Sequence, residues 1–377
     1  MITIHDKALC CGCAACVQIC PKQCIEFEED NQGFRYPSIN TSICINCGLC
    51  ELVCPILNQN NKASLPIRVY ASKNRSEEIR SSSSSGGVFT ALAERVLRQG
   101  GVVFGARFDS NWEVEHDFVC GSQNISIFRG SKYMQSRIGA TYVQAERFLK
   151  DGRKVLYSGT PCQIAGLNHY LRKDYNNLIT VDVICHGVPS PLVWRHYLKN
   201  VTEGQRVTDV VFRNKVHSWK KYNFSIKGDD GALIDQPFYE NLYMRGFLDD
   251  IYLRPSCYEC VCKCGKSGAD ITLGDFWGIE RHLPEFDDDK GVTAVLAHTV
   301  KAVDCLETLD LDSHEISYEK VLEGNPSLEK SARNNAEWRR EYWGREDQVE
   351  AISYILKKKT PNLFKRIVTK LSRMLRN

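Results

Sequence analysis

The sequence predicts an α+β/α/β protein, in which a small cysteine-rich module precedes an α/β domain with a partly parallel sheet. Ten of the 18 cysteines lie between residues 10 and 54, so the start of the chain differs chemically from the rest. Farther along, apolar strands at residues 154–158 and 178–184 flank a helical segment, as in a parallel β-α-β unit. The 377 residues suffice for two or three domains.

A polar stretch at residues 58–64 separates the cysteine-rich module from the rest. We expect the module in residues 1–60, the two parts of the α/β domain in residues 65–145 and 146–315, and a helical, basic tail in residues 316–377. Within the second part, strands near residues 207–213 and 222–227 predict an antiparallel insertion.

The start of the chain lacks the basic and apolar regions of a signal peptide, and no apolar run approaches the about 18–20 residues that span a bilayer. We therefore expect a cytoplasmic protein. Thiols stay reduced in that compartment, where they serve as soft ligands for iron–sulfur clusters or zinc.

Each half of the module repeats one motif: three cysteines separated by two residues, then a fourth cysteine after three more, followed by proline. The eight cysteines are Cys10, Cys13, Cys16, Cys20, Cys44, Cys47, Cys50 and Cys54. Bacterial ferredoxins hold two 4Fe-4S clusters with this motif, and the fourth cysteine of each run ligates the other cluster. We therefore expect a first set (Cys10, Cys13, Cys16 and Cys54) and a second set (Cys44, Cys47, Cys50 and Cys20). Zinc knuckles, the alternative, use two separated cysteine pairs.

Two cysteines follow the strands of the β-α-β unit. Thr160 and Gln163 form a predicted capping box at the start of the helix, which places Cys162 in the first helical turn. Cys185 follows the second strand. Because parallel strands end at the same edge of a sheet, we expect both thiols at the carboxyl edge, where α/β sheets bind ligands.

A third set of metal ligands follows from this placement. Cys257 and Cys260 form a pair that needs two partners, and Cys162 and Cys185 are the candidates. These four would hold a third 4Fe-4S cluster. Zinc at the same thiolates is one alternative. Replacement of one ligand by Cys262 or Cys264 is another.

Five stretches in order resemble the family of coenzyme F420 hydrogenase and dehydrogenase beta subunits, which are iron–sulfur flavoproteins. They are residues 84–87, 130–136, 159–163, 185–190 and 254–260, the last together with 274–278. The resemblance spans about residues 65–300, with the ferredoxin module fused in front. It implies an oxidoreductase that binds FAD and one further 4Fe-4S cluster. In such relatives a hydride passes between a deazaflavin and FAD, and single electrons continue through clusters.

The resemblance also implies which residues line the flavin site: Ser85, Gly86, Gly87, Lys132, Ser136, Thr160, Gln163 and Asp275. Helix N-termini and Lys132 suit a pyrophosphate and an anionic reduced flavin. Asp275 is either a flavin contact or a turn residue. His186, the one candidate catalytic residue, could donate to a cluster sulfur or to the flavin, or could be structural.

The predicted function is therefore an electron relay between a hydride-carrying donor or acceptor (F420-like or another), FAD and 4Fe-4S clusters. One alternative is a ferredoxin-like electron-transfer adaptor without flavin or substrate of its own. Another is a zinc-stabilised docking module. The expected partner is a redox protein or a hydride-carrying coenzyme. The domain lacks a Gly-x-Gly-x-x-Gly dinucleotide fingerprint, so direct use of NADH is not indicated.

The end of the chain is strongly basic. Residues 357–377 contain eight Lys or Arg and no acid. The whole chain has a net charge of +3, so the other 356 residues have a net charge of −5. Apolar residues recur with helical spacing from 364 to 375, which predicts a basic amphipathic helix. Such a helix can lie on an anionic membrane as a peripheral contact, or pack as an ordinary terminal helix. One basic tail does not make a basic groove, so nucleic-acid binding is not expected.

Overall fold

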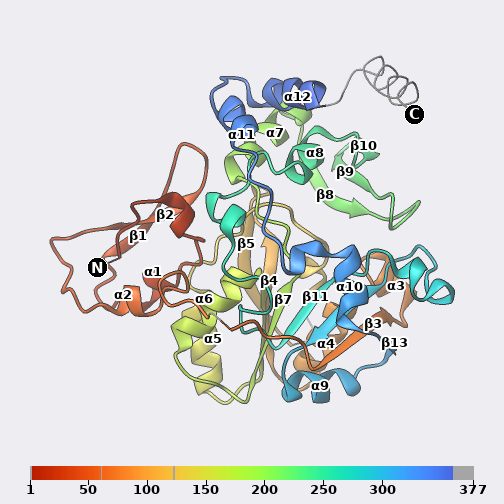
Figure 1. Ribbon diagram of the computed structural model, residues 1–377, viewed down its shortest axis with the longest axis horizontal. Helices are drawn as coiled ribbons and strands as arrows, with labels where there is room; N and C mark the ends of the chain where they lie inside the picture. The colour runs from red at the N-terminus through yellow and green to blue at the C-terminus, as the bar shows by residue number, and fades with distance from the viewer. Residues whose placement is uncertain (1, 61, 122–123, 360–377) are drawn as a thin grey trace, which may run out of the picture.

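The computed structural model describes residues 2–60, 62–121 and 124–359. Figure 1 shows the cysteine-rich module beside a large sheet with helices, and a smaller lobe beyond the sheet. In the module, α1 (Ala15–Ile19) and α2 (Leu49–Leu52) flank an antiparallel hairpin of β1 (Ile25–Glu29) and β2 (Arg35–Ile39). The module is therefore ferredoxin-like, as the cysteine motif predicts.

The main sheet has eight strands in the order β13-β3-β12-β11-β7-β6-β4-β5. Their bounds are β3 (Arg68–Asn74), β4 (Val102–Phe108), β5 (Val114–Cys120), β6 (Val155–Gly159), β7 (Leu178–Val183), β11 (Ile271–Asp275), β12 (Thr293–Ala297) and β13 (Leu311–Glu315). The central strands β4, β6, β7 and β11 pair in parallel, whereas the pairs at both edges are antiparallel. The prediction of a partly parallel sheet is confirmed.

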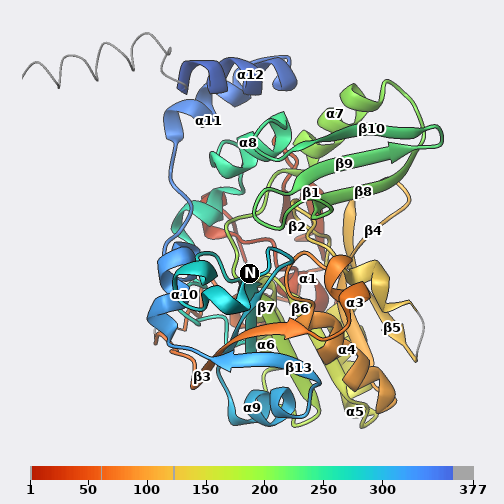
Figure 2. The ribbon, with the colours of Figure 1, turned by 90° about the vertical axis from the view of Figure 1, so that its right-hand side faces the viewer.

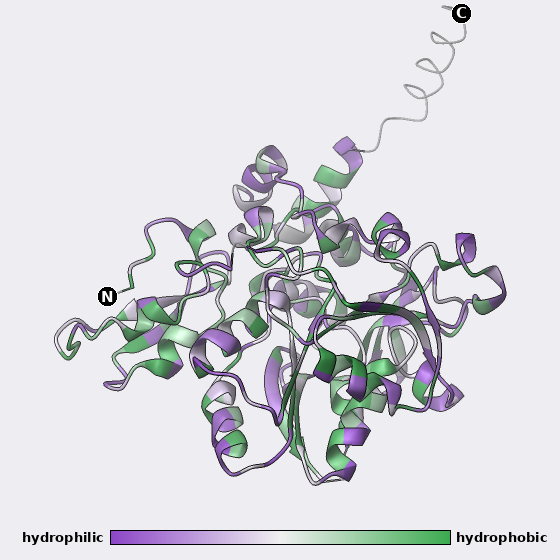
Figure 3. Ribbon diagram, turned by 60° about the horizontal axis from the view of Figure 1, so that its bottom comes forward, coloured by the Kyte–Doolittle hydropathy of each residue, from purple (hydrophilic) through white to green (hydrophobic). Residues whose placement is uncertain are grey.

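Helices cover both faces of this sheet. On one face, α4 (Val88–Arg98) and α9 (Val300–Glu307) share a core with the strands. On the other face lie α5 (Thr141–Lys150), α6 (Pro161–Leu171) and α10 (Tyr318–Gly324). Figure 3 shows apolar strands between helices that alternate polar and apolar residues. All five residues of β12 are buried, which matches a strand covered on both faces.

The lobe is built around a three-stranded antiparallel sheet in the order β10-β9-β8. Its elements are α7 (Pro191–Thr202), β8 (Val207–Asn214), β9 (Asn223–Gly228), β10 (Gly231–Pro237), α8 (Leu242–Leu248), α11 (Ala336–Trp343) and α12 (Gln348–Lys359). Figure 2 shows α11 and α12 at the same end of the molecule as this sheet. The core of the lobe is mainly aromatic, with Trp194, Phe212 and Tyr243 fully buried.

Short segments complete the chain: α3 (Glu77–Ser81) and the 3-10 turns η1 (Lys7–Leu9), η2 (Ile125–Phe128), η3 (Pro255–Glu259), η4 (Ile279–Arg281), η5 (Pro284–Phe286) and η6 (Pro326–Leu328). The predicted amphipathic helix near residues 364–375 lies outside the described residues. Among the residues that are described, no helix is both long and apolar enough to cross a membrane.

The module shares one hydrophobic core with the α/β domain. Cys13 and Ile56 of the module belong to the same buried cluster as Tyr142 and Leu167 of α5 and α6. Arg254, only 1% exposed, ties the two parts together. Its guanidinium donates to the carbonyl oxygens of Cys10 (2.7 Å) and Arg35 (3.0 Å) and to Gln135 Oε1 (2.9 Å). The module is thus docked in a fixed place.

Candidate functional site

The first cysteine set comes together in the interior. Cys10, Cys13, Cys16 and Cys54 are each no more than 9% exposed. Burial, together with the charges of Cys10 and Cys54, raises the pKa of Cys16 to about 12. Arg254 Nη2 lies 3.6 Å from Cys10 Sγ, so one cation faces this group of thiols. A buried group of four thiols with a neighbouring cation fits a bound 4Fe-4S cluster.

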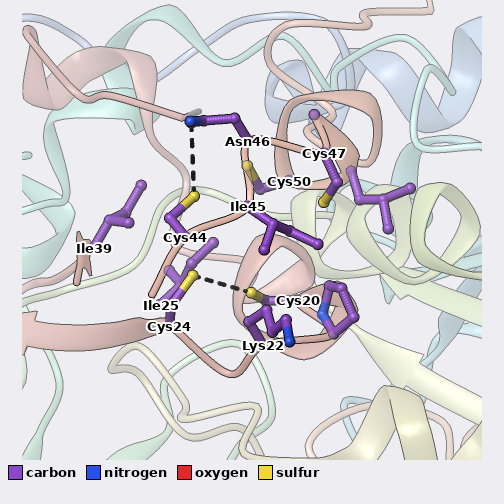
Figure 4. Close-up of a pocket in the computed structure, with 13 residues that line it drawn as sticks. Cys20, Lys22, Cys24, Ile25, Ile39, Cys44, Ile45, Asn46, Cys47 and Cys50 are labelled. Atoms are coloured by element: carbon purple, nitrogen blue, oxygen red, sulfur yellow. Dashed lines mark hydrogen bonds between the residues drawn. The ribbon is translucent and has the colours of Figure 1, made fainter. Parts of the chain in front are cut away.

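The second set lies near the surface of the module. Cys20, Cys44, Cys47 and Cys50 line one small pocket, together with Cys24 and apolar residues such as Ile45 (Figure 4). Cys47 is exposed, whereas Cys50 is buried and accepts a hydrogen bond on Sγ from the amide of Ile2 (3.4 Å). The chain therefore brings the predicted second ligands together with one of them open to solvent.

The third set forms at the carboxyl edge of the sheet, as the sequence predicts. Strand β6 leads into α6 through the capping box, in which the Thr160 amide donates to Gln163 Oε1 (2.9 Å). This places Cys162 next to Cys185, which follows the parallel strand β7. The 3-10 turn η3 brings the other two thiols, and one pocket is lined by Cys162, Cys185, Cys257 and Cys260.

Ionising these four neighbouring thiols costs free energy unless a positive charge lies close to them. Burial and the neighbouring thiolates raise the pKa of Cys185 to about 12 and that of Cys257 further. Lys263, 8% exposed, offsets part of this charge and donates from Nζ to the carbonyl oxygens of Cys185 (2.5 Å) and Ser327 (2.7 Å). All the cysteines are free thiols, so disulfides do not explain the grouping. Thiolates grouped in this way are typical ligands of a soft metal centre.

The structure bears on which cysteines belong to the third set. Cys262 lines the pocket beside Cys260, and Cys264 is not among the lining residues. The hydrogen bond between Cys260 and Cys262 lowers the pKa of Cys260 to about 6 and raises that of Cys262. Cys262 therefore stays an alternative to Cys260 as the fourth thiol of the third set. In the part of the chain that the structure describes, no three His, Cys, Asp or Glu side chains converge tightly enough to hold a single metal ion.

Cys11 connects the first and third sets. It is buried, its thiol interacts with those of Cys13 and Cys162, and it lines the pocket of the third set. Helix α6 allows this contact because it has Gly166 where it meets the module. A Cβ atom at Gly166 would lie 2.7 Å from Cys13 Cβ and 2.9 Å from Cys13 Sγ. Cys11 falls outside the repeated cysteine motif, so the sequence does not predict this contact between two sets.

A cavity of about 590 Å³ lies between the α/β domain and the β8 strand of the lobe. Ligand sites in proteins commonly have this size. Its charged lining residues are Glu77, Arg129, Lys132, Asp209, Arg213, Lys215 and Lys290, which gives a surplus of three positive charges when every lysine is protonated. The serines at positions 81–84, which precede helix α4, form part of the wall. The cavity therefore favours an anionic ligand.

Two lysines in this wall are unusual. Burial lowers the pKa of Lys132 to about 7, and burial together with Arg213 lowers the pKa of Lys215 to about 7. Lys215 Nζ donates to the carbonyl oxygens of Arg80, Ser85 and Lys290, each at 2.8 Å. Lys215 thus fixes the serine loop, while Lys132 donates to the carbonyl of Arg129 (3.0 Å) within its own loop.

Of the residues that the family resemblance assigns to the flavin, Lys132 alone lines this cavity. Ser85, Gly86 and Gly87 lie directly behind the serine wall, where the Gly86 amide donates to Thr293 Oγ1 (2.9 Å). Asp275 lies outside the lining and supports it through an ion pair with Arg213. Trp219 Nε1 also donates to Asp275 (2.9 Å).

The remaining predicted flavin residues form a separate network near the third set. Gln163 Nε2 donates to Ser136 Oγ (2.8 Å), and Ser136 Oγ lies 3.0 Å from His116 Nδ1. Thr160 Oγ1 lies 3.3 Å from Cys162 Sγ. Burial lowers the pKa of His116 to about 4, which leaves this imidazole neutral at pH 7. The structure therefore places Ser136, Thr160 and Gln163 beside the cysteines and not in the cavity wall.

A series of aromatic contacts leads from the third set to the cavity. The His186 ring packs edge-on against Phe247 (centroids 5.1 Å apart), and Phe247 stacks on Tyr133 (4.8 Å). Tyr133 in turn contacts Phe212, which lines the cavity (5.6 Å). His186 Nε2 lies 2.6 Å from Asp250 Oδ1, so a buried carboxylate orients this ring. His186 thus lies in the wall of the third set, separated from the cavity by these rings.

Sequence motifs do not identify several residues of the site. Arg213 and Lys215 come from a strand of the insertion and the turn after it, where no motif marks them. Arg254 looks like an ordinary basic residue before a proline. The only available signal for Arg254 is its place in a stretch that the family resemblance includes.

Comparison with known proteins finds matches along most of the chain. Two family models describe the beta subunits of coenzyme F420 hydrogenase/dehydrogenase. The model of their N-terminal part matches residues 69–140, and the model of their C-terminal part matches residues 152–321. A 4Fe-4S dicluster domain model matches residues 9–57. Together the first two models cover well over half of the chain.

Individual proteins match as well. One of the subunits of the F420H2 dehydrogenase of Methanosarcina mazei is 24% identical over 290 residues, 72% of this chain and 75% of that protein. A 7Fe ferredoxin of Hydrogenibacillus schlegelii is 38% identical over 64 residues, 16% of this chain and 76% of the ferredoxin. A chain of the F420-reducing [NiFe] hydrogenase complex of Methanosarcina barkeri aligns with a TM-score of 0.48 at 16% identity, over 76% of this chain and 96% of that one.

Proposed function

Because this chain belongs to the family of coenzyme F420 hydrogenase/dehydrogenase beta subunits and is an iron–sulfur electron-transfer protein, we propose that it works as a flavin-dependent oxidoreductase. In this proposal it holds three 4Fe-4S clusters and one FAD, and it exchanges electrons with a hydride-carrying coenzyme and a redox protein. When bound, FAD converts a two-electron hydride into single electrons, which 4Fe-4S clusters carry one at a time.

The observation that carries this proposal is the contact series between the cavity and the third set. Phe212, Tyr133 and Phe247 connect the cationic cavity to His186, and Cys185 is its direct neighbour along the chain. On the other side, Cys11 joins the third set to the first. Successive contacts thus connect the cavity, the third set and the module, as an electron relay requires. A ferredoxin-like electron-transfer adaptor without flavin does not require a cavity of this charge and size.

The residues of the chain have separable tasks. Lys132, Arg213 and Lys215 supply positive charge for the anionic parts of a dinucleotide such as FAD, and the serine wall supplies hydroxyl groups. Asp275 is a positioning residue, because it pairs with Arg213 and does not line the cavity. Arg254 and Lys263 offset the charge of the thiolates from outside the ligand sets.

The test is an element and flavin count on protein purified without oxygen. We expect about twelve irons, matching acid-labile sulfide and one FAD per chain, since each cluster holds four irons. About eight irons without flavin would overturn the proposal in favour of the adaptor. About eight irons with one zinc would make the third set a structural zinc site.

Two variants separate the cofactors. Cys257→Ala should lower the count to about eight irons and leave FAD bound. Cys305→Ala is the matched control, because Cys305 is a cysteine in the core under α9 that belongs to none of the three sets. Lys132→Met should weaken FAD and leave all the iron in place. Loss of FAD from Cys257→Ala but not from Lys132→Met would contradict the assignment of the cavity.

A further inference from the structure

One end of the module exposes apolar side chains beside the second cysteine set. Ile43 is 49% exposed and Ile45 56% in the loop that carries Cys44 and Cys47, and Leu52 is 55% exposed on α2. We call Ile43, Ile45, Cys47 and Leu52 the module patch. Grouped apolar side chains on a surface mark sites of contact with other molecules. Here Ile45 lines the pocket of the second set together with Cys47, a predicted cluster ligand that is itself exposed.

The module patch is the one place where the cysteine sets open clearly to solvent among the described residues. The first set is buried, and the four cysteines of the third set are partly buried in a pocket that Cys11 and Ile56 of the module help to line. Figure 1 shows α2 on the side of the module that faces away from β8 and the lobe, where the cavity opens. A protein can therefore cover the module patch while a small molecule still enters the cavity.

The module that carries the patch is acidic as a whole, although the exposed Lys22 also lines the pocket of the second set. Residues 2–60 contain three Lys or Arg and six Asp or Glu, a formal charge of −3 before any cluster adds its own negative charge. Two of these acids, Glu26 and Glu28, are exposed along β1, whereas Lys7 is held in an ion pair with Asp30. A partner that fits this surface has an apolar centre with Lys or Arg around it.

We propose that the module patch docks a second electron-transfer protein, whose own redox centre lies at an apolar surface ringed by basic residues. The inference rests on one part of the proposed function, namely that the second set holds a cluster. Contacts of this kind are small, so four side chains with a charged rim are sufficient. One electron passes from the reduced cluster to the partner's oxidised centre, and no bond or proton is exchanged.

Mitochondrial cytochrome c, a basic protein with a surface-exposed haem edge, is the probe. The loaded protein is reduced with dithionite, freed of excess reductant and mixed with ferric cytochrome c, and haem reduction is followed by stopped flow at several salt concentrations. We expect a second-order rate that falls with salt. Glu26→Lys/Glu28→Lys should lower the low-salt rate by about tenfold or more, because attraction steers the encounter. Ile43→Ser/Leu52→Ser should lower the rate at every salt concentration.

Matched controls lie on α9, at the far side of the α/β domain. Asp304→Lys/Glu307→Lys makes the same charge change, and Val300→Ser removes an apolar side chain that is 69% exposed. Neither should change the rate by more than about twofold, since α9 covers the face of the sheet opposite to the one that shares a core with the module. Binding of ferrous cytochrome c to the reduced protein, measured by calorimetry, should follow the same order without any net reaction.

Equal effects of the patch and α9 variants, or no effect of either, would overturn the proposal. So would a dimer in sedimentation that only the patch variants dissociate, since a second copy of the chain would then be the occupant. Chemical reduction bypasses the flavin. A preparation with its module irons but no FAD therefore tests docking even if the flavin assignment fails.

Discussion

Replacing Gly166 by alanine tests how closely the module and the α/β domain are packed. In an exposed helix this change would stabilise the protein by about 1 kcal/mol, because alanine has the higher helix propensity. In α6 the new Cβ would lie 2.7 Å from Cys13 Cβ, 2.9 Å from Cys13 Sγ and 3.0 Å from Tyr142 Oη. Overpacking of this kind costs about 1–3 kcal/mol, so we expect a net destabilisation of up to about 2 kcal/mol.

The strain acts directly on a predicted ligand of the first cluster. We therefore expect Gly166→Ala to unfold at a lower temperature and to lose up to about four irons per chain, measured by thermal unfolding and iron analysis. His169→Ala is the control, because His169 lies in the same helix and is only partly buried. If Gly166→Ala unfolds at a higher temperature than the wild type and keeps all its iron, the close contact between α6 and Cys13 does not exist.

Three further predictions concern other parts of the site. Arg254→Ala should lower the unfolding temperature and expose the module to limited proteolysis, because it leaves the buried Cys10 and Arg35 carbonyls without their donor; unchanged proteolysis would refute this. In protein without flavin, the pKa of Lys132 is lowered to about 7, so the unfolded chain binds one more proton than the folded chain between about pH 7 and 10.5. The free energy of unfolding therefore rises with pH in this range. Lys132→Met should flatten that slope, measured by urea unfolding at about pH 7 and 9. During timed exposure to air, iron should leave the second set first, because Cys47 is exposed; equal loss from both module clusters by electron paramagnetic resonance would contradict this.

Local sequence patterns were sufficient to predict the backbone around the third set. The capping box at Thr160, the two apolar strands and the direction of a parallel β-α-β unit place Cys162 and Cys185 at one edge. The repeated motif likewise predicts the module, since its ligands all lie within 45 residues. Short-range spacing and the handedness of local units determine these features.

Contacts between distant segments could not be predicted in this way. Asp275 pairs with Arg213 from another sheet, so its role depends on how the lobe packs on the α/β domain. Ser136 and Gln163 turn toward His116, a residue that no motif marks. The Cys11 contact with Cys162 exists only because the module docks on α6. Each depends on tertiary packing, which spacing along the chain does not encode.

The pairing of β3 has a consequence for the order of assembly during synthesis. This strand follows the module directly, yet its partners in the sheet are β12 and β13, near the other end of the domain. On the ribosome β3 must therefore wait until residues 293–315 have emerged, whereas the module has all eight of its cysteines by residue 54. The module can receive iron while the sheet is still open. If the third set holds a cluster as proposed, it can receive iron only after the module, because its ligands lie between residues 162 and 260.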